Sequence, residues 1–154
     1  MAQKHGECEL RILILFPFKD HEMENNYLHS NITSIIIKAF YIVFNKLGYG
    51  FLEKVYRNAL VIELRRQGLN CIINLAISVY YDNYKVGFYV ADIVVNECVI
   101  VETKTAENLC KEDEAQLVNY LKSTEIEVGL LLNFGKKPQF RRKVFSSEFK
   151  EHNR

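Results

Sequence analysis

The 154-residue chain has no long apolar run, no closely spaced cysteine pair and no large excess of either charge. No apolar run approaches the roughly 18 residues of a membrane-spanning helix, so we expect no membrane partner. The four cysteines form no C-x-x-C pair, which argues against a zinc site or a disulfide framework and favours a reduced, cytoplasmic protein. With a net charge of only +1, a nucleic-acid site must rest on local patches.

What is present predicts one folded domain, because 49% of the residues are apolar. Apolar spacing changes along the chain from helical to strand-like and back. Ser30 or Asn31 is the expected N-cap of the first helix. The expected elements are helices over 32–47 and about 52–67, strands over 72–81, 86–95 and 99–104, a helix over 110–123, a strand over 127–134 and an edge strand over 139–145. This ααβββαβ(β) order predicts an α/β (α+β) fold with one mixed β-sheet flanked by helices.

The two ends of the chain fall outside this pattern. Residues 1–26 are expected to be an N-terminal extension, residues 27–145 the domain, and residues 146–154 a tail. The apolar run 11–18 is short, and no A-x-A-like cleavage site follows it. We therefore favour an additional edge strand, or an arm packing on a partner subunit in a homodimer, over a signal peptide.

The stretch "VADIVVNECVIVETKT" places charges inside two apolar strands. Asp92 lies within the first strand, and Glu102 and Lys104 close the second. An ionised group in an apolar interior costs several kcal/mol unless it is paired or bound to a metal. We therefore expect these three side chains to offset this cost together, by pairing with one another or by binding a metal ion.

The length of the turn between the two strands decides whether the carboxylates meet. A two-residue loop would place Asp92 opposite Val101, with Glu102 on the other face of the sheet. A three-residue loop over 96–98, or a bulge, would pair Val95 with Val99 and Asp92 with Glu102. We predict the second arrangement, because two close carboxylates can share a cation.

Carboxylates and a lysine gathered in this way suit metal-assisted hydrolysis of a phosphodiester. Carboxylate oxygens hold Mg²⁺ or Mn²⁺, and a lysine can position the attacking water or stabilise charge on the phosphate. On these residues alone, a partly buried salt bridge from Lys104 to Glu102 or Asp92 explains the pattern equally well.

Two helices carry further polar candidates. Glu53 and Tyr56 lie one helical turn apart, and Gln116 and Tyr120 form an i,i+4 pair. Glu53 is also explained as a partner of the helix dipole, and the second pair as the polar margin of an amphipathic helix.

The chain resembles the GxxExxY proteins, a branch of the PD-(D/E)XK nuclease superfamily. "GFLEKVY", "ADIVV…VIVETKT" and "EAQLVNYLKST…VGLLLNFG" carry the resemblance, in family order, over about residues 27–144. It implies a restriction-endonuclease-like core, with Asp92 and Glu102 as metal ligands and Lys104 as the catalytic lysine. It also implies that Glu53 is a further acidic active-site residue. The side chains implied to contact nucleic acid or support the site are Tyr56, Gln116 and Tyr120.

The chain departs from the family at several positions. Tyr49 stands in place of a turn proline, and Phe44 and Asp113 stand where the family commonly has histidines. No implied metal ligand is missing.

The basic run "KKPQFRRK" holds five cations and no acid. It can contact phosphates, or it can be the charged edge of a sheet. The candidate contacts within it are Lys136, Lys137, Arg141 and Arg142.

The function that we expect is a metal-dependent nuclease that acts on DNA or RNA. The alternative is a non-catalytic module of the same fold that binds nucleic acid or protein.

Overall fold

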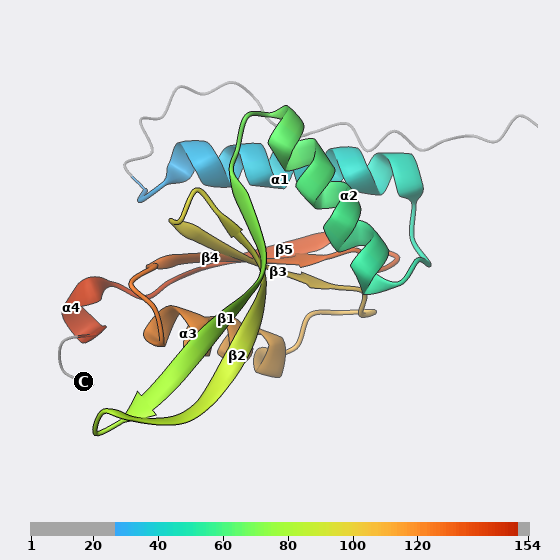
Figure 1. The fold of residues 1–154 in the computed structure, drawn as a ribbon. Helices are drawn as coiled ribbons and strands as arrows, with labels where there is room; N and C mark the ends of the chain where they lie inside the picture. The colour runs from blue at the N-terminus through green and yellow to red at the C-terminus, as the bar shows by residue number, and fades with distance from the viewer. Residues whose placement is uncertain (1–26, 151–154) are drawn as a thin grey trace, which may run out of the picture.

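The computed structural model describes residues 27–150, which form a five-stranded mixed sheet with helices on both faces (Figure 1). The strands lie side by side in chain order, and the fold class predicted from the sequence is confirmed. The elements are α1 (Ser30–Leu47), α2 (Glu53–Arg66), β1 (Cys71–Tyr81), β2 (Tyr84–Val95), β3 (Val99–Lys104), α3 (Lys111–Lys122), β4 (Val128–Asn133), β5 (Gln139–Val144) and α4 (Ser147–Lys150).

The sheet separates two apolar cores. α1 and α2 cover one face, where Phe40, Leu60 and Leu130 are buried, and α3 covers the other, where Leu117 and Leu131 are buried (Figure 1). β3 and β4 are parallel and are joined through α3, whereas the other neighbouring strands are antiparallel. The carboxyl ends of β3 and β4 therefore lie at the same edge of the sheet.

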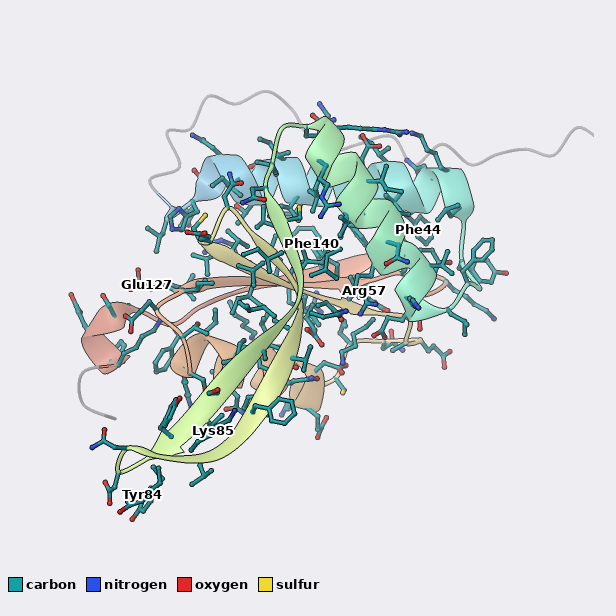
Figure 2. The ribbon with its side chains drawn as sticks, viewed as in Figure 1. Phe44, Arg57, Tyr84, Lys85, Glu127 and Phe140 are labelled. Carbon is teal, nitrogen blue, oxygen red and sulfur yellow. The ribbon has the colours of Figure 1, made fainter. Side chains whose placement is uncertain are left out.

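β1 and β2 form a long hairpin that extends past the rest of the sheet (Figure 1). Its turn is at Asp82 and Asn83, which have φ values of 46° and 66°. Two successive residues in the left-handed region are what a type I′ hairpin turn requires. Tyr84 and Lys85 follow the turn and lie at the far end of the hairpin (Figure 2).

The start of α1 differs from the prediction. The N-cap is His29, with φ 56°, instead of Ser30 or Asn31, and its side chain makes no capping hydrogen bond. A tertiary contact fixes this start, because Arg142 of β5 donates to the Leu28 carbonyl at 2.7 Å. Local sequence preferences carry no information about that contact.

The sequence predicts an N-terminal extension over residues 1–26 and a tail over residues 146–154. The extension, with its apolar run, lies outside the described residues. At the other end, the expected tail contains the short helix α4.

No helix of residues 27–150 has the length and apolar character needed to cross a membrane. Cys71, Cys98 and Cys110 are free thiols.

Candidate active site

The register between β2 and β3 confirms the predicted three-residue loop. Val95 pairs with Val99, and Ile93 pairs with Val101. The next row of the same register places Asp92 opposite Glu102, so the two carboxylates are neighbours across the strands.

Regular pairing of the two strands stops at this row. Asp92 turns its own carboxylate onto β3, where Oδ2 accepts hydrogen bonds from the Thr103 backbone N–H (2.9 Å) and from the Thr103 hydroxyl. On the β1 side, Asn74 has a φ of 55°, which is rare in a strand. Polar side chains therefore replace the ladder on both sides of Asp92.

Arg57 of α2 neutralises Asp92. Its Nη1 lies 3.2 Å from Asp92 Oδ1 and 3.0 Å from Asn74 Oδ1. Figure 2 shows Arg57 on the side of α2 that faces the strands. Sequence reasoning did not select Arg57, although its i,i+4 spacing from Glu53 places both residues on one face of α2.

Lys104 lies at the end of β3 and contacts both β3 and α3. Its Nζ is 3.9 Å from Glu102 Oε1 and 3.6 Å from Asp113 Oδ1, and it donates to Gln116 Oε1 at 3.1 Å. The sequence left open whether Lys104 pairs with Glu102 or with Asp92. In the structure Lys104 lies beside Glu102, and Arg57 pairs with Asp92.

Glu102 is the most buried carboxylate of the site, with 5% of the residue exposed. Its Oε2 has no hydrogen-bond partner among the described residues. Burial, and then the negative charge of Asp92, raise the pKa of Glu102 to about 8, against the opposing effect of Lys104. The positive charge near Glu102 is therefore too small to stabilise its ionised form at neutral pH.

Glu53, the first residue of α2, belongs to the same electrostatic cluster. Burial and then Asp92 raise its pKa, while Lys104 and Arg57 lower it. The carboxyl group of Glu53 is therefore coupled electrostatically to Asp92 of β2 and Lys104 of β3, in addition to its position in the first turn of α2.

Gln116 and Tyr120 of α3 extend the contacts of Lys104. Gln116 accepts from Lys104 and donates through Nε2 to the Tyr120 hydroxyl. Burial, and then the charge of Glu102, raise the pKa of Tyr120 to about 12, so its hydroxyl stays protonated near neutral pH. The two hydrogen bonds that link Lys104 to Gln116 and Gln116 to Tyr120 orient the lysine side chain.

Tyr56 has a different role, because it is fully buried. Its hydroxyl donates to the Gly48 carbonyl at 2.7 Å and accepts from the Phe51 N–H at 3.2 Å. Tyr56 therefore holds the α1–α2 turn and presents no surface to nucleic acid.

The basic run does not act as a single patch. Arg141 and Lys143 pair with Glu114 of α3, and Arg142 holds the segment before α1. Lys136 and Lys137, in the β4–β5 loop, are exposed.

Within residues 27–150, no three acidic, histidine or cysteine side chains converge closely enough to hold a metal by themselves. Asp92 and Glu102 still fit one, since they are adjacent carboxylates and Glu102 Oε2 is buried without a partner. This donor set suits an ion such as Mg²⁺, which binds one or two carboxylates and keeps its other positions for water and phosphate.

Comparison with known proteins agrees with this fold. The sequence profile of the PD-(D/E)XK nuclease superfamily matches residues 30–143. A solved protein, described as "Crystal structure of SSO0001", has a similar fold with a TM-score of 0.51 and 17% identity; the match covers 71% of this chain and 58% of that one. At that identity the likeness shows the fold alone. No curated protein shows significant similarity. Because the profile covers well over half of the sequence, the chain belongs to the PD-(D/E)XK nuclease superfamily.

Proposed function

We propose that this protein is a divalent-metal-dependent nuclease that hydrolyses phosphodiester bonds in DNA or RNA. One observation carries the proposal. Asp92, Glu102 and Lys104 meet where the β2–β3 ladder opens, and the site contains a buried carboxylate oxygen with no partner. An unsatisfied buried group costs about 1–3 kcal/mol, and a divalent ion bound by Glu102 would offset that cost.

The proposed roles follow from the positions of the side chains. Asp92 and Glu102 would hold Mg²⁺ or Mn²⁺, and the bound ion supplies a water of lowered pKa and a positive charge beside the phosphate. Lys104, held by Gln116, would orient the attacking water and stabilise negative charge on the phosphoryl oxygens. Glu53, whose carboxyl group is coupled to Asp92 and Lys104, would accept a hydrogen bond from a water of the same site.

We also propose that the chain is a member of the GxxExxY branch. Each residue of that motif has a physical reason here. Gly50 has a φ of 108°, which disfavours any residue with a Cβ, and Tyr56 holds the turn around it. Glu53 brings a carboxyl group to the site. The spacing of the motif therefore couples a turn to an active-site acid.

Two measurements test the proposal. The first is calorimetry with Mn²⁺, where we expect binding by the wild-type protein and at least a tenfold weaker affinity in Glu102→Ala. The second is a cleavage assay on single-stranded DNA, duplex DNA and RNA with Mg²⁺ or Mn²⁺. Asp92→Asn should reduce cleavage by roughly 100-fold or more, because a divalent ion would lose one of its two protein ligands.

A matched control is Glu63→Gln. Glu63 is also a buried glutamate of the domain, but it pairs with Lys46 and Arg66 away from the site. This variant should bind Mn²⁺ and cleave like the wild type. Absence of Mn²⁺ binding and of cleavage in the wild type, with nucleic-acid binding retained, would establish the non-catalytic module instead.

A further inference from the structure

A pocket of about 360 Å³ lies beside the site, beyond the carboxyl ends of the parallel strands β3 and β4. Three segments line it: the α1–α2 turn at 49–51, the β3–α3 connection at 105–107 and the start of the β4–β5 loop at 134–136. Ligands commonly bind in crevices at the carboxyl ends of parallel strands, and the volume lies in the lower range of ligand pockets.

One wall of the pocket is fixed by Tyr56. Its buried hydroxyl uses both of its hydrogen-bonding functions on the α1–α2 turn, at the Gly48 carbonyl and the Phe51 N–H. The Tyr56 ring stacks on Phe134, which forms part of the pocket, with 4.6 Å between ring centroids. The aromatic wall is therefore held before any ligand arrives.

A second wall of the pocket is fixed by Asn133. This side chain is fully buried, and its amide accepts from the Ala106 N–H and donates to the Ala106 carbonyl, both at 2.9 Å. Ala106 packs so closely that a Cβ on Gly135 would lie 2.0 Å from the Ala106 oxygen. The hydrogen bonds of two buried side chains, Tyr56 and Asn133, thus hold the three segments that line the pocket in place.

The lining combines aromatic rings with one cation and one acid. Tyr49 is 60% exposed and Phe51 is 49% exposed, so both rings are accessible to a ligand that enters the pocket. Lys136 and Glu107 belong to the lining and are exposed. Exposed rings stack on nucleobases, a lysine binds a phosphate, and a carboxylate can accept a hydrogen bond from a base N–H, such as N3–H of thymine.

The chain places this pocket next to the proposed chemistry. Thr105, in the lining, directly follows Lys104, and Phe51 precedes Glu53 by two residues. A nucleotide that placed its phosphate at Lys104 would have its neighbouring base within reach of the pocket.

We propose that this pocket receives one unpaired nucleobase beside the scissile phosphate, stacked on Phe51 and Tyr49, with Lys136 contacting the flanking phosphate. The inference rests on the proposed function and narrows its substrate class to single strands, or to duplexes with an unpaired nucleotide. A base held in a duplex stack has no free face to offer the pocket.

The test is binding of fluorescein-labelled dT12 and of an abasic strand of equal length and charge, by anisotropy in EDTA, so that no cleavage occurs. The wild type should prefer dT12, and Phe51→Ala should weaken dT12 binding by about 5- to 100-fold, as loss of base stacking does. It should leave the abasic strand unaffected. Phe51→Trp should restore the preference for dT12.

Two further variants sharpen the test. Phe88→Ala removes another exposed phenylalanine, on the β1–β2 hairpin, and should change neither affinity. Lys136→Gln should weaken the binding of both dT12 and the abasic oligonucleotide. It should also reduce the slope of log affinity against log salt concentration by about 0.7, the value for one phosphate contact with single-stranded DNA. Tyr49→Ala should act in the direction of Phe51→Ala.

The outcomes separate the two proposals. Cleavage and dT12 binding that are undiminished in both Phe51→Ala and Tyr49→Ala would overturn the pocket and leave the nuclease in place. A loss of the dT12 preference in these variants, in a protein that never cleaves, would support the pocket and overturn the nuclease.

Discussion

At the scale of single residues, the buried carboxyl group of Glu102 lowers the stability of the folded protein at neutral pH. Its pKa of about 8 lies well above the ordinary value of 4.5, mainly because of burial. Between these two pH values the unfolded chain releases a proton that the folded protein retains. The contribution of Glu102 to stability should therefore fall as pH rises from about 4.5 to 8, and this loss is complete above that range.

Glu102→Gln should remove this pH-dependent loss. We expect the variant to match the wild type near pH 4 and to be more stable by about 1–4 kcal/mol at pH 8, since each pKa unit corresponds to about 1.4 kcal/mol. Urea unfolding followed by circular dichroism at both pH values, without divalent metal, measures the difference. Parallel stability curves for the two proteins would show that Glu102 ionises freely in the fold.

Lys104 should affect stability and activity differently. Lys104→Met removes the cation that contacts Glu102 and Asp113, so the metal-free protein should lose up to a few kcal/mol. Added Mn²⁺ should recover much of that stability by binding to the folded state. Cleavage should stay at least roughly 100-fold reduced, because the ion cannot replace a positioned lysine.

The measurements are melting curves with and without Mn²⁺ and a cleavage assay on the same variant. Lys143→Met is the control, since Lys143 also pairs with an acid, Glu114, outside the cluster. The control should cleave normally. Wild-type cleavage by Lys104→Met would assign the lysine to structure alone.

At the scale of elements, the loop between β2 and β3 sets the geometry of the site. Asn96 and Glu97 both have positive φ, 48° and 57°. Asn96 tolerates this conformation and also exchanges hydrogen bonds with the Asn70 backbone. Glu97 has no such compensation in its residue type, because the left-handed region costs roughly 1–2 kcal/mol for residues with a Cβ.

Glu97→Gly should therefore stabilise the protein, by about 0.5–1 kcal/mol after the greater flexibility of glycine in the unfolded chain is subtracted. The three-residue loop length is kept, so the pairing of Val95 with Val99 and the Mn²⁺ affinity should not change. Thermal unfolding and calorimetry on the variant check both expectations. A destabilised variant would indicate that the Glu97 side chain has a contact that outweighs its backbone strain.

The elements also show how far the sequence predicts this structure. Helices and strands follow from apolar periodicity, and the facing of Asp92 and Glu102 follows from the argument that two carboxylates need a shared partner. The pairing of Arg57 with Asp92 does not follow, because it depends on where α2 crosses the sheet. The start of α1 at His29 is equally inaccessible, since Arg142 reaches it from the other end of the domain.

At the scale of the whole molecule, the site joins both layers of the fold. Glu53 and Arg57 come from α2 on one face of the sheet, and Asp113 comes from α3, which covers the other. The strands β2 and β3 contribute Asp92, Glu102 and Lys104 between them. A metal ion held by Asp92 and Glu102 would link β2 to β3 beside residues of both helical layers, so its binding energy should stabilise the folded domain.

Divalent metal should consequently raise the melting temperature of the wild-type protein. The carboxyl groups of Glu53, Asp92, Glu102 and Asp113 interact with only two cations, Arg57 and Lys104, and a divalent ion would supply further positive charge that favours the ionised form of Glu102. At a metal concentration 100-fold above Kd, binding contributes about 2.7 kcal/mol, which for a domain of this size corresponds to a rise of roughly 5–15 °C.

The measurement is a thermal scan in Mg²⁺ or Mn²⁺ against EDTA, at ionic strength matched with KCl to cancel general screening. Asp92→Asn combined with Glu102→Gln should abolish the rise, whereas Glu63→Gln should keep it. An equal rise in the double variant would place the metal elsewhere on the molecule.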